Sequence, residues 1–593
     1  MAALFTTPKR NDKTSGAYFA EPDVRRRIAL AHGSWRRVTR RIVVGAVCAL
    51  TVSSLLMPSV SLAAEWVKVG GNKYNTAASD EAGTWSWDGA DVLKLNNYNG
   101  GEIQAAGKLN VNYSGTNIVT AEWIESINVS HGTNENAELN IQGDEGGTLS
   151  VTSTEDAILS TGNINIDGAG SVNATSTGFD AINAGGDLAI KGSGNVNATG
   201  ASDGIRANGN ITIDDSGAVT ARATKDKGIG TDKNLTIKGG GTVEASSADG
   251  EALWSGGNIN ISDGNQVKAS SEKDAAVEAK GSLAATNASL NVNGVEYGVY
   301  AYKGVTLDHA TVTVRTSANG GQAIALITDG SDIDIKNGST VDAFAEGEVS
   351  AAFSTRNDRP NEKGGHIYVS DSVVKAIARY VENGDGPIPY SENQDGETRR
   401  EPQGENIGII AQTSEGVTPA VISIIRSKVT AEGDTAAIFA RAISADGKTI
   451  GTIKIENAAI QTPEGGKFID YRKLRDGIYE AGQAIGTGDA TVDSLYIKAV
   501  AKSTTIAPPE VAKPEDPKPD ETKPAESKPA ESKQNPKPEG SKPTKAVAAS
   551  TTKAKTTGVL AATGDTSGAA IVATVLAGTA AIAAGTMASR KRS

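Results

Sequence analysis

The chain is poor in cysteine and in aromatic residues. Among its 593 residues there is one cysteine, Cys48, and aromatic side chains make up 4% of the sequence. Because Cys48 lies inside an apolar leader, the rest of the chain can form neither disulfides nor thiolate metal sites. So few aromatic residues in so long a chain are unusual for a large globular enzyme. They favour several small domains or one elongated repeat.

Basic residues are scarce in the central part of the chain. Between Ala64 and Gly564 there are 45 basic and 66 acidic residues, a net charge of −21. Such a region repels phosphate backbones and anionic lipids, which excludes nucleic acid as a partner.

Residues 1–63 have the features of a signal peptide with a long basic n-region. The basic run ends at Arg41, and the apolar segment 42–62 follows it. Small residues at the end of this segment predict cleavage after Ala63, so that Ala64 begins the mature protein. Two alternatives stay open: a retained membrane helix, and export through the twin-arginine rather than the general route.

A pentapeptide, an apolar span and a basic tail follow one another at the C-terminal end, in the segment 560–593. The pentapeptide is Leu560-Ala561-Ala562-Thr563-Gly564. Residues 569–587 are apolar or small, just enough to span a bilayer, and three basic residues follow them. This order resembles the sortase sorting signal of Gram-positive cell-wall proteins, with Ala561 in place of the usual proline.

The resemblance implies that sortase cuts between Thr563 and Gly564 and joins Thr563 to peptidoglycan. The protein would then be exported and held covalently at the cell surface, with a transient membrane-anchored precursor. The alternative is a plain membrane anchor. Residues 506–559 precede the signal and hold ten of the 19 prolines, which predicts a disordered, extended linker that spans the wall.

Between these ends, apolar residues recur in three series with a period of 22 to 25 residues. The series are Ile164, Leu188, Ile211, Leu235 and Ile259; Val172, Val196, Val219, Val243 and Val267; and Ile158, Ile182, Ile205, Ile229, Leu253, Val277, Val299 and Ile324. Each repeat therefore contains three short strands joined by tight turns. One repeat has too little apolar surface to fold alone, so the repeats must stack.

The fold predicted from this period is all-β: a parallel β-helix solenoid of about 24-residue, three-strand coils over residues 129–505. Longer spacings towards the C-terminal side place an insertion loop at 382–405. Residues 64–128 are expected to form an N-terminal cap and the first coils. We expect the rod to be a monomer.

The cap region contains most of the tryptophans of the mature chain. Its Trp85-Ser-Trp87-Asp-Gly segment and the Val92-Leu-Lys-Leu95 that follows resemble the opening of a class of bacterial surface β-helix proteins, some described as carbohydrate-binding. The resemblance implies a structural motif but no ligand. Trp85 and Trp87 could stack on sugar rings, or they could cover the open end of the solenoid; we favour the cap.

Six aspartates recur near one corner of the predicted coil. They are Asp156, Asp180, Asp203, Asp226, Asp249 and Asp274. Stacking would bring their carboxylates into a ladder, which could bind Ca²⁺ or hydrolyse glycosidic bonds. The interpretation we favour is that they close the turns between strands, since a recurrent residue suits structure better than a single active site. No catalytic residue, metal site or required cofactor is predicted.

Two functions remain. In the first, a wall-anchored rod displays a non-catalytic face that binds a glycan or a host-surface ligand. In the second, the β-helix is a polysaccharide lyase or glycoside hydrolase, which needs a base and a basic side chain on adjacent coils. We prefer the first.

Overall fold

The computed structural model describes residues 63–509 apart from short internal gaps. The gaps are 122–126, 131–136, 215–216, 319–320, 358–364, 382–389, 393–397, 401–404, 415–417, 446, 476, 489–490 and 496–497. The predicted signal peptide, linker, pentapeptide and apolar span 569–587 lie outside the described residues. Within the described part every regular element is a strand, and no helix there is long and apolar enough to cross a membrane.

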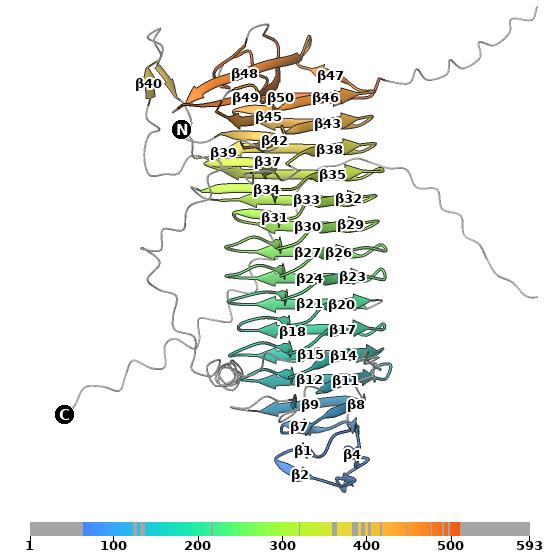
Figure 1. Ribbon diagram of the computed structural model, residues 1–593. Coiled ribbons are helices and arrows are strands. Elements are labelled where there is room, and N and C mark those ends of the chain that lie inside the picture. Colours follow the sequence, from blue (N-terminus) through green and yellow to red (C-terminus); the bar gives the residue numbers. More distant parts are fainter. Residues whose placement is uncertain are drawn as a thin grey trace, which may run out of the picture. The chain divides into compact units, whose positions relative to one another are not determined.

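The strands form three long sheets, A, B and C (Figure 1). Sheet A contains β3 (Ala78–Ser79), β4 (Trp85–Trp87), β5 (Val92–Asn96), β8 (Lys108–Ser114), β11 (Glu138–Gly143), β14 (Asn163–Gly168), β17 (Leu188–Lys191), β20 (Ile211–Asp214), β23 (Leu235–Lys238), β26 (Ile259–Ile261), β29 (Leu283–Thr286), β32 (Val305–Asp308), β35 (Ile333–Lys336), β38 (Ile367–Ser370), β43 (Val421–Ile425) and β46 (Thr452–Glu456). Sheet B contains β1 (Val67–Val69), β2 (Asn72–Tyr74), β7 (Ile103–Ala106), β10 (Ile127–Ser130), β13 (Ile158–Ser160), β16 (Ile182–Ala184), β19 (Ile205–Ala207), β22 (Ile229–Thr231), β25 (Leu253–Ser255), β28 (Val277–Ala279), β31 (Tyr297–Ala301), β34 (Gln322–Asp329), β37 (Val349–Asn357), β42 (Asn406–Thr413), β45 (Ala436–Ser444), β48 (Lys467–Arg475) and β49 (Ile478–Gly486). Sheet C contains β6 (Asn99–Gly100), β9 (Thr116–Ala121), β12 (Thr148–Ser153), β15 (Ser171–Ser176), β18 (Val196–Gly200), β21 (Ala218–Ala223), β24 (Thr242–Ser247), β27 (Gln266–Ser271), β30 (Ser289–Gly294), β33 (Thr311–Ser317), β36 (Thr340–Gly347), β39 (Val373–Tyr380), β44 (Lys428–Gly433), β47 (Ala459–Thr462) and β50 (Ser503–Ala507).

From β7 onwards the chain visits sheets B, A and C in turn, so that three strands make one coil. From β8 to β39 and from β42 to β46, each strand pairs in parallel with its equivalent in the coil before it; Leu188 pairs with Ile164, for example, and Ile211 with Leu188. Parallel stacking of this kind is the arrangement of a β-helix, and it confirms the all-β repeat expected from the 24-residue period.

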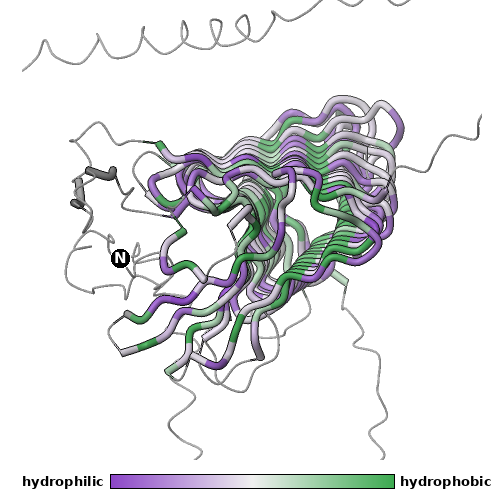
Figure 2. Tube along the Cα trace, turned by 90° about the horizontal axis from the view of Figure 1, so that it is seen from above, coloured by the Kyte–Doolittle hydropathy of each residue, from purple (hydrophilic) through white to green (hydrophobic). Residues whose placement is uncertain are grey.

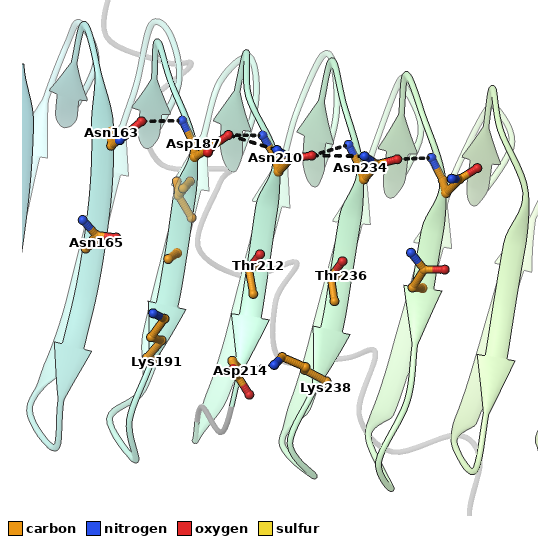
Figure 3. A pocket seen from close by; sticks show the side chains of 14 residues that line it. Asn163, Asn165, Asp187, Lys191, Asn210, Thr212, Asp214, Asn234, Thr236 and Lys238 are labelled. Atoms are coloured by element: carbon orange, nitrogen blue, oxygen red, sulfur yellow. Dashed lines mark hydrogen bonds and ion pairs between the residues drawn. The ribbon is translucent and has the colours of Figure 1, made fainter. Parts of the chain in front are cut away.

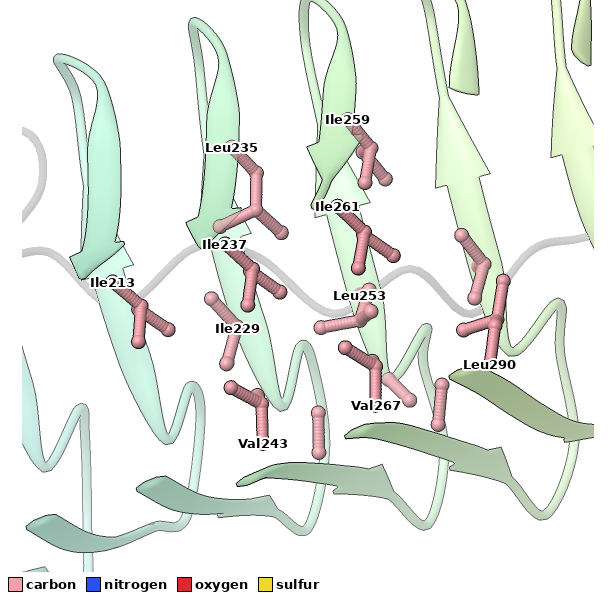
Figure 4. Close-up of a cluster of buried hydrophobic side chains, with 14 of the residues drawn as sticks. Ile213, Ile229, Leu235, Ile237, Val243, Leu253, Ile259, Ile261, Val267 and Leu290 are labelled. Carbon is pink, nitrogen blue, oxygen red and sulfur yellow. The ribbon is translucent and has the colours of Figure 1, made fainter. Parts of the chain in front are cut away.

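The interior is a continuous stack of aliphatic side chains (Figure 4). Within each strand of the regular coils buried and more exposed residues alternate, as in β23, where Leu235 and Ile237 are buried and the residues beside them are half-buried. Viewed along the stack, hydrophobic residues recur at the same places in successive coils (Figure 2). Each such side chain contributes about 1.5 to 3 kcal/mol of burial free energy. A single coil holds only a few of them, so the coils are stable only when stacked.

One member of the predicted third series is misplaced. Val299 pairs with Leu326, and Ile324 pairs with Tyr297. Leu326 belongs to the interior cluster, whereas Ile324 lies in a second apolar cluster. The reason is the longer connection between β33 and β34, which shifts the equivalent position by two residues.

The N-terminal end of the stack is closed by antiparallel strands. β1 pairs with β2 and with β7, and β3, β4 and β5 form an antiparallel meander that joins β8. Trp85 and Trp87 point into the core and are 7% and 2% exposed. Tyr74 packs against Trp85 with ring centroids 5.1 Å apart.

The C-terminal end is closed differently. The hairpin of β48 and β49 pairs antiparallel with β45, while β50 inserts between β44 and β47. Side chains of the hairpin and of the segment after it join the second apolar cluster on the outer side of sheet B. The predicted end of the β-helix at 505 falls inside β50, which continues to Ala507.

The predicted insertion at 382–405 falls between two coils. β39 ends at Tyr380 and β42 begins at Asn406. Between them the described residues include a short antiparallel hairpin, β40 (Tyr390–Glu392) and β41 (Thr398–Arg400).

Candidate functional site

A ladder of asparagine and aspartate side chains runs along the start of five strands of sheet A (Figure 3). Each side-chain oxygen accepts a hydrogen bond from the backbone N–H of the equivalent residue in the next coil. The distances are 2.8 Å from Asp187 N to Asn163 Oδ1, 2.6 Å from Asn210 N to Asp187 Oδ1, 3.3 Å from Asn234 N to Asn210 Oδ1, 2.9 Å from Asn258 N to Asn234 Oδ1 and 2.9 Å from Ser282 N to Asn258 Oδ1. This ladder satisfies backbone groups at a turn that would otherwise need water.

The ladder explains why glycine precedes the asparagine in most repeats. A Cβ atom added at Gly209 would collide with Asp187 Oδ1, and one at Gly281 would collide with Asn258 Oδ1. The Gly-Asn pair therefore leaves room for the ladder oxygen of the coil before it. The period was predicted from apolar residues, and this side-chain role of the Gly-Asn pair was not predicted.

Next to the ladder lies an open groove of about 690 Å³ on the outer face of sheet A. It crosses β14, β17, β20, β23 and β26. Its lining residues are Asn163, Asn165, Asp187, Leu188, Ala189, Lys191, Asn210, Thr212, Asp214, Asn234, Thr236, Lys238, Asn258 and Asn260. Amide and hydroxyl groups thus recur in it at the spacing of neighbouring strands, about 4.8 Å.

The charges in the groove balance one another. Lys238 Nζ lies 2.9 Å from Asp214 Oδ2, and Lys191 and Asp187 contribute one further charge of each sign. Asn165 extends a row of outward amides, because its Nδ2 donates to Asn140 Oδ1 at 2.8 Å. A surface of this kind offers hydrogen bonds in both directions without net charge, which suits a ligand rich in hydroxyl groups.

Three of the six predicted aspartates stack at one turn before sheet B. Asp156, Asp180 and Asp203 each accept a hydrogen bond through Oδ1 from the backbone N–H one coil further on. The donors are Asp180 at 2.9 Å, Asp203 at 2.9 Å and Lys227 at 2.6 Å. These carboxylates therefore bridge successive turns.

The other three aspartates lie beside that ladder. The register of sheet B puts Lys227 and Glu251 at the equivalent positions of the next two coils. Asp226, Asp249 and Asp274 occupy neighbouring turn positions instead, because the step from Ile205 to Ile229 is 24 residues and the step from Asp203 to Asp226 is 23. Asp249 Oδ1 contacts Lys273 Nζ at 2.5 Å.

Burial changes the acidity of the stacked carboxylates. Asp180 and Asp203 are 8% and 4% exposed. Loss of solvation, together with the charge of Asp156, raises the pKa of Asp180 to about 6. Loss of solvation, together with the charges of Asp180 and Asp226, raises the pKa of Asp203 to about 7. Among the described residues, no group of three or more His, Cys, Asp or Glu side chains is placed to hold a metal ion.

The two tryptophans considered as a glycan platform do not form one. Trp85 and Trp87 are both buried in the hydrophobic core of the N-terminal cap. No ring face of either is available for a sugar, so their placement fits the capping role.

Comparison of the chain with models of known families, with curated proteins and with solved structures gives no match.

Proposed function

We propose that this protein is exported, anchored to the cell wall and displays its β-helix as a non-catalytic glycan-binding rod. The observation that supports binding is the groove across five strands of sheet A, which has no net charge and is lined by amide and hydroxyl groups. A groove that is open and repeats along the stack is suited to a chain-like ligand rather than to a small molecule enclosed on all sides.

The anchoring half of the proposal depends on the segment 560–593. The Leu560-Ala561-Ala562-Thr563-Gly564 motif is the candidate substrate of a sortase, and Thr563 the residue joined to peptidoglycan. The apolar span 569–587 and its basic tail would hold the chain at the membrane while the transpeptidase acts.

A Thr563→Ala variant of the full chain tests the anchoring. Export should be unchanged, and the protein should move from the muramidase-released wall fraction to the membrane or the medium. If the variant remains wall-linked in the wild-type amount, the sorting-signal proposal is wrong and the apolar span is a plain anchor.

A glycan array tests the binding. The fragment 64–509 is suitable because the described hydrophobic clusters lie entirely within it. We expect retention of a subset of neutral polysaccharides, and a loss of retention when Thr236 and Asn260, in the middle of groove strands, are replaced by Ala. Retention that is the same with and without these substitutions would contradict a groove site.

A second candidate is a surface polysaccharide lyase or hydrolase. One observation favours it: burial, together with the hydrogen bond that protonated Glu251 donates to Glu278, raises the pKa of Glu251 to about 7, and Lys227 Nζ lies 4.0 Å from Glu251 Oε2 on the adjacent coil. A polysaccharide-degradation assay on the same fragment distinguishes the two candidates. Release of reducing or unsaturated ends that is lost in Glu251→Gln would favour the enzyme.

A further inference from the structure

Aromatic side chains are rare in this chain, yet several gather on the outer side of sheet B. The register of the sheet puts Arg206, Gly230, Trp254, Glu278 and Tyr300 in one row, each residue beside its equivalent in the next coil. The residues on either side of each row member point into the core, so the row faces outward. Trp254 and Tyr300 are half-buried.

The rings lie among hydrogen-bonding groups. Arg206 Cζ is 5.9 Å and Lys227 Nζ is 5.3 Å from the centroid of Trp254. Two coils further along, Tyr300 stacks on Tyr302 with centroids 4.4 Å apart and planes inclined by 12°. The two aromatic groups are about 10 Å apart, since neighbouring strands are about 4.8 Å apart.

Gly230 determines how Lys227 approaches the indole. A Cβ atom at Gly230 would lie 2.8 Å from Lys227 Cδ. The absence of a side chain at Gly230 therefore lets the lysine chain lie flat across β22 and bring its ammonium group to Trp254.

Each cation of this face has a carboxylate partner. Arg206 Nη2 lies 2.5 Å from Asp232 Oδ1. Lys227 pairs with Asp226, and Lys280 pairs with Glu278. Lys280 Nζ also lies 3.0 Å from Tyr302 Oη. Since positive and negative groups alternate, the face favours neither a polyanion nor a polycation.

We propose that Trp254, Tyr300 and Tyr302, with the ion pairs of Arg206, Lys227 and Lys280, form a second binding site on sheet B for an uncharged pyranose chain. The apolar face of a sugar ring stacks on the indole of Trp254. The edges of Tyr300 and Tyr302 contact the neighbouring units, because Tyr297 packs against Tyr300 with centroids 5.1 Å apart and Lys280 Nζ lies 4.3 Å from the centroid of Tyr302. The paired Arg or Lys and carboxylate groups exchange hydrogen bonds with the hydroxyl groups of the sugar. The distance between the indole and the tyrosine pair matches about two sugar units. The site lies on a different sheet from the sheet A groove.

The test uses the fragment 64–509 and four neutral hexasaccharides: cellohexaose, maltohexaose, mannohexaose and chitohexaose. Tryptophan emission and calorimetry follow the titrations. We expect at least one of the four sugars to change the emission, and Trp254→Ala to weaken its binding about tenfold, which corresponds to about 1.4 kcal/mol. Trp254→Tyr, which keeps a ring, should retain most of the affinity.

Trp66 supplies a matched control. It is half-buried in the N-terminal cap and also carries a lysine over its ring, with Lys73 Nζ 4.2 Å from the centroid. Trp66→Ala should bind the sugars as the wild type does. Circular dichroism and melting curves confirm that each variant is folded.

Three results would overturn the proposal. The first is unchanged sugar binding in Trp254→Ala. If binding is then lost in the Thr236 and Asn260 variants, the sugar binds in the sheet A groove and not on sheet B. The second is that none of the four sugars alters the emission. The third is that spermine or a lysine-rich peptide alters it and the sugars do not, which would make this face a cation site.

Discussion

Sheet B is buried on one face in the regular coils and on both faces in the C-terminal coils. In the coils from β13 to β30 the strands of sheet B are three residues long, and half of their outward residues are polar: Asn183, Arg206 and Glu278. In the coils from β34 to β45 the strands are eight or nine residues long, and β42 is buried along its whole length. There side chains of the β48–β49 hairpin and of the segment after it pack with outward residues of sheet B, so the sheet has a second apolar cluster.

The difference shows that the alternation of apolar and polar residues depends on whether one or both faces of a strand are buried. A strand with one buried face alternates apolar and polar residues, whereas a strand buried on both faces reads as an unbroken apolar run. The segments Ile407-Gly-Ile-Ile410 and Ala436-Ala-Ile-Phe439 are such runs. Both parts share the aliphatic interior. The regular coils add ladders of polar side chains at their turns, and the C-terminal coils add the second apolar cluster.

The largest expected effect is at that cluster. Phe439 is 0% exposed, and its ring centroid lies 5.1 Å from that of Tyr471 on β48. Phe439→Ala should cost about 3 to 5 kcal/mol of unfolding free energy, from lost burial and the cavity left behind. Denaturant unfolding measures the loss, and hydrogen exchange should show it in β45, β48 and β49 rather than in the coils β13 to β30, because coils of a solenoid interact with their neighbours only.

Leu474 on the same hairpin is the control, since it is 58% exposed. Leu474→Ala should change stability by less than about 0.5 kcal/mol. Equal loss of protection in all coils after Phe439→Ala would show that the stack unfolds as one unit and would remove the distinction between the two parts.

The sequence predicts the regular coils more fully than the C-terminal coils. The Ile164, Leu188 and Ile211 ladder was predictable because one-sided burial imposes a period of one coil. The place of Ile324 was not, since a longer turn shifts the register and both faces of β34 are buried. The hairpin of β48 and β49 has no counterpart in the repeat, so the repeat period does not predict it.

The candidate site was predictable only in part. The stacking of Asp156, Asp180 and Asp203 follows from their spacing, but a one-residue difference in step removes Asp226 from the row. The sequence contains a sign of the Asn234 ladder, because Asn or Asp recurs before the first Ile or Leu of the sheet A strands. The sequence alone does not distinguish a residue that only forms a turn from one that hydrogen-bonds to the next coil. Trp254 stands alone in its repeat, so only the fold shows that Tyr300 shares its face.

A smaller effect is expected at the aspartate ladder of the regular coils. The folded pKa of Asp203, about 7, is above the ordinary value of 3.8, because burial and neighbouring carboxylates oppose its ionisation. The folded state therefore holds its proton more tightly than the unfolded chain, so stability falls as the pH rises from about 4 to about 7. Asp203→Asn should remove that loss and stabilise the protein by on the order of 2 kcal/mol at pH 8, with little effect at pH 4.

Melting curves from pH 4 to pH 8, with and without Ca²⁺, measure this effect. Asp249→Asn is the control, because Asp249 lies at an exposed turn paired with Lys273. A stabilising effect of Ca²⁺ that disappears in Asp203→Asn would instead show that the ladder binds the metal.

The smallest effect is expected in the asparagine ladder of sheet A. It tests whether this polar ladder adds to the stability that the aliphatic stack gives the regular coils. Asn234 Oδ1 accepts the N–H of Asn258 at 2.9 Å, and Asn234 Nδ2 donates to Asn210 Oδ1 at 3.1 Å. Asn234→Ala removes both bonds at a turn that water can partly reach, so the cost should be about 1 kcal/mol. Asn260→Ala, on an exposed position of the same groove, should cost less than half as much. Because Asn234→Asp keeps the acceptor and loses the donor, its melting temperature should lie between those of the wild type and Asn234→Ala. Equal melting temperatures for Asn234→Ala and Asn260→Ala would show that the ladder adds nothing beyond the aliphatic stack.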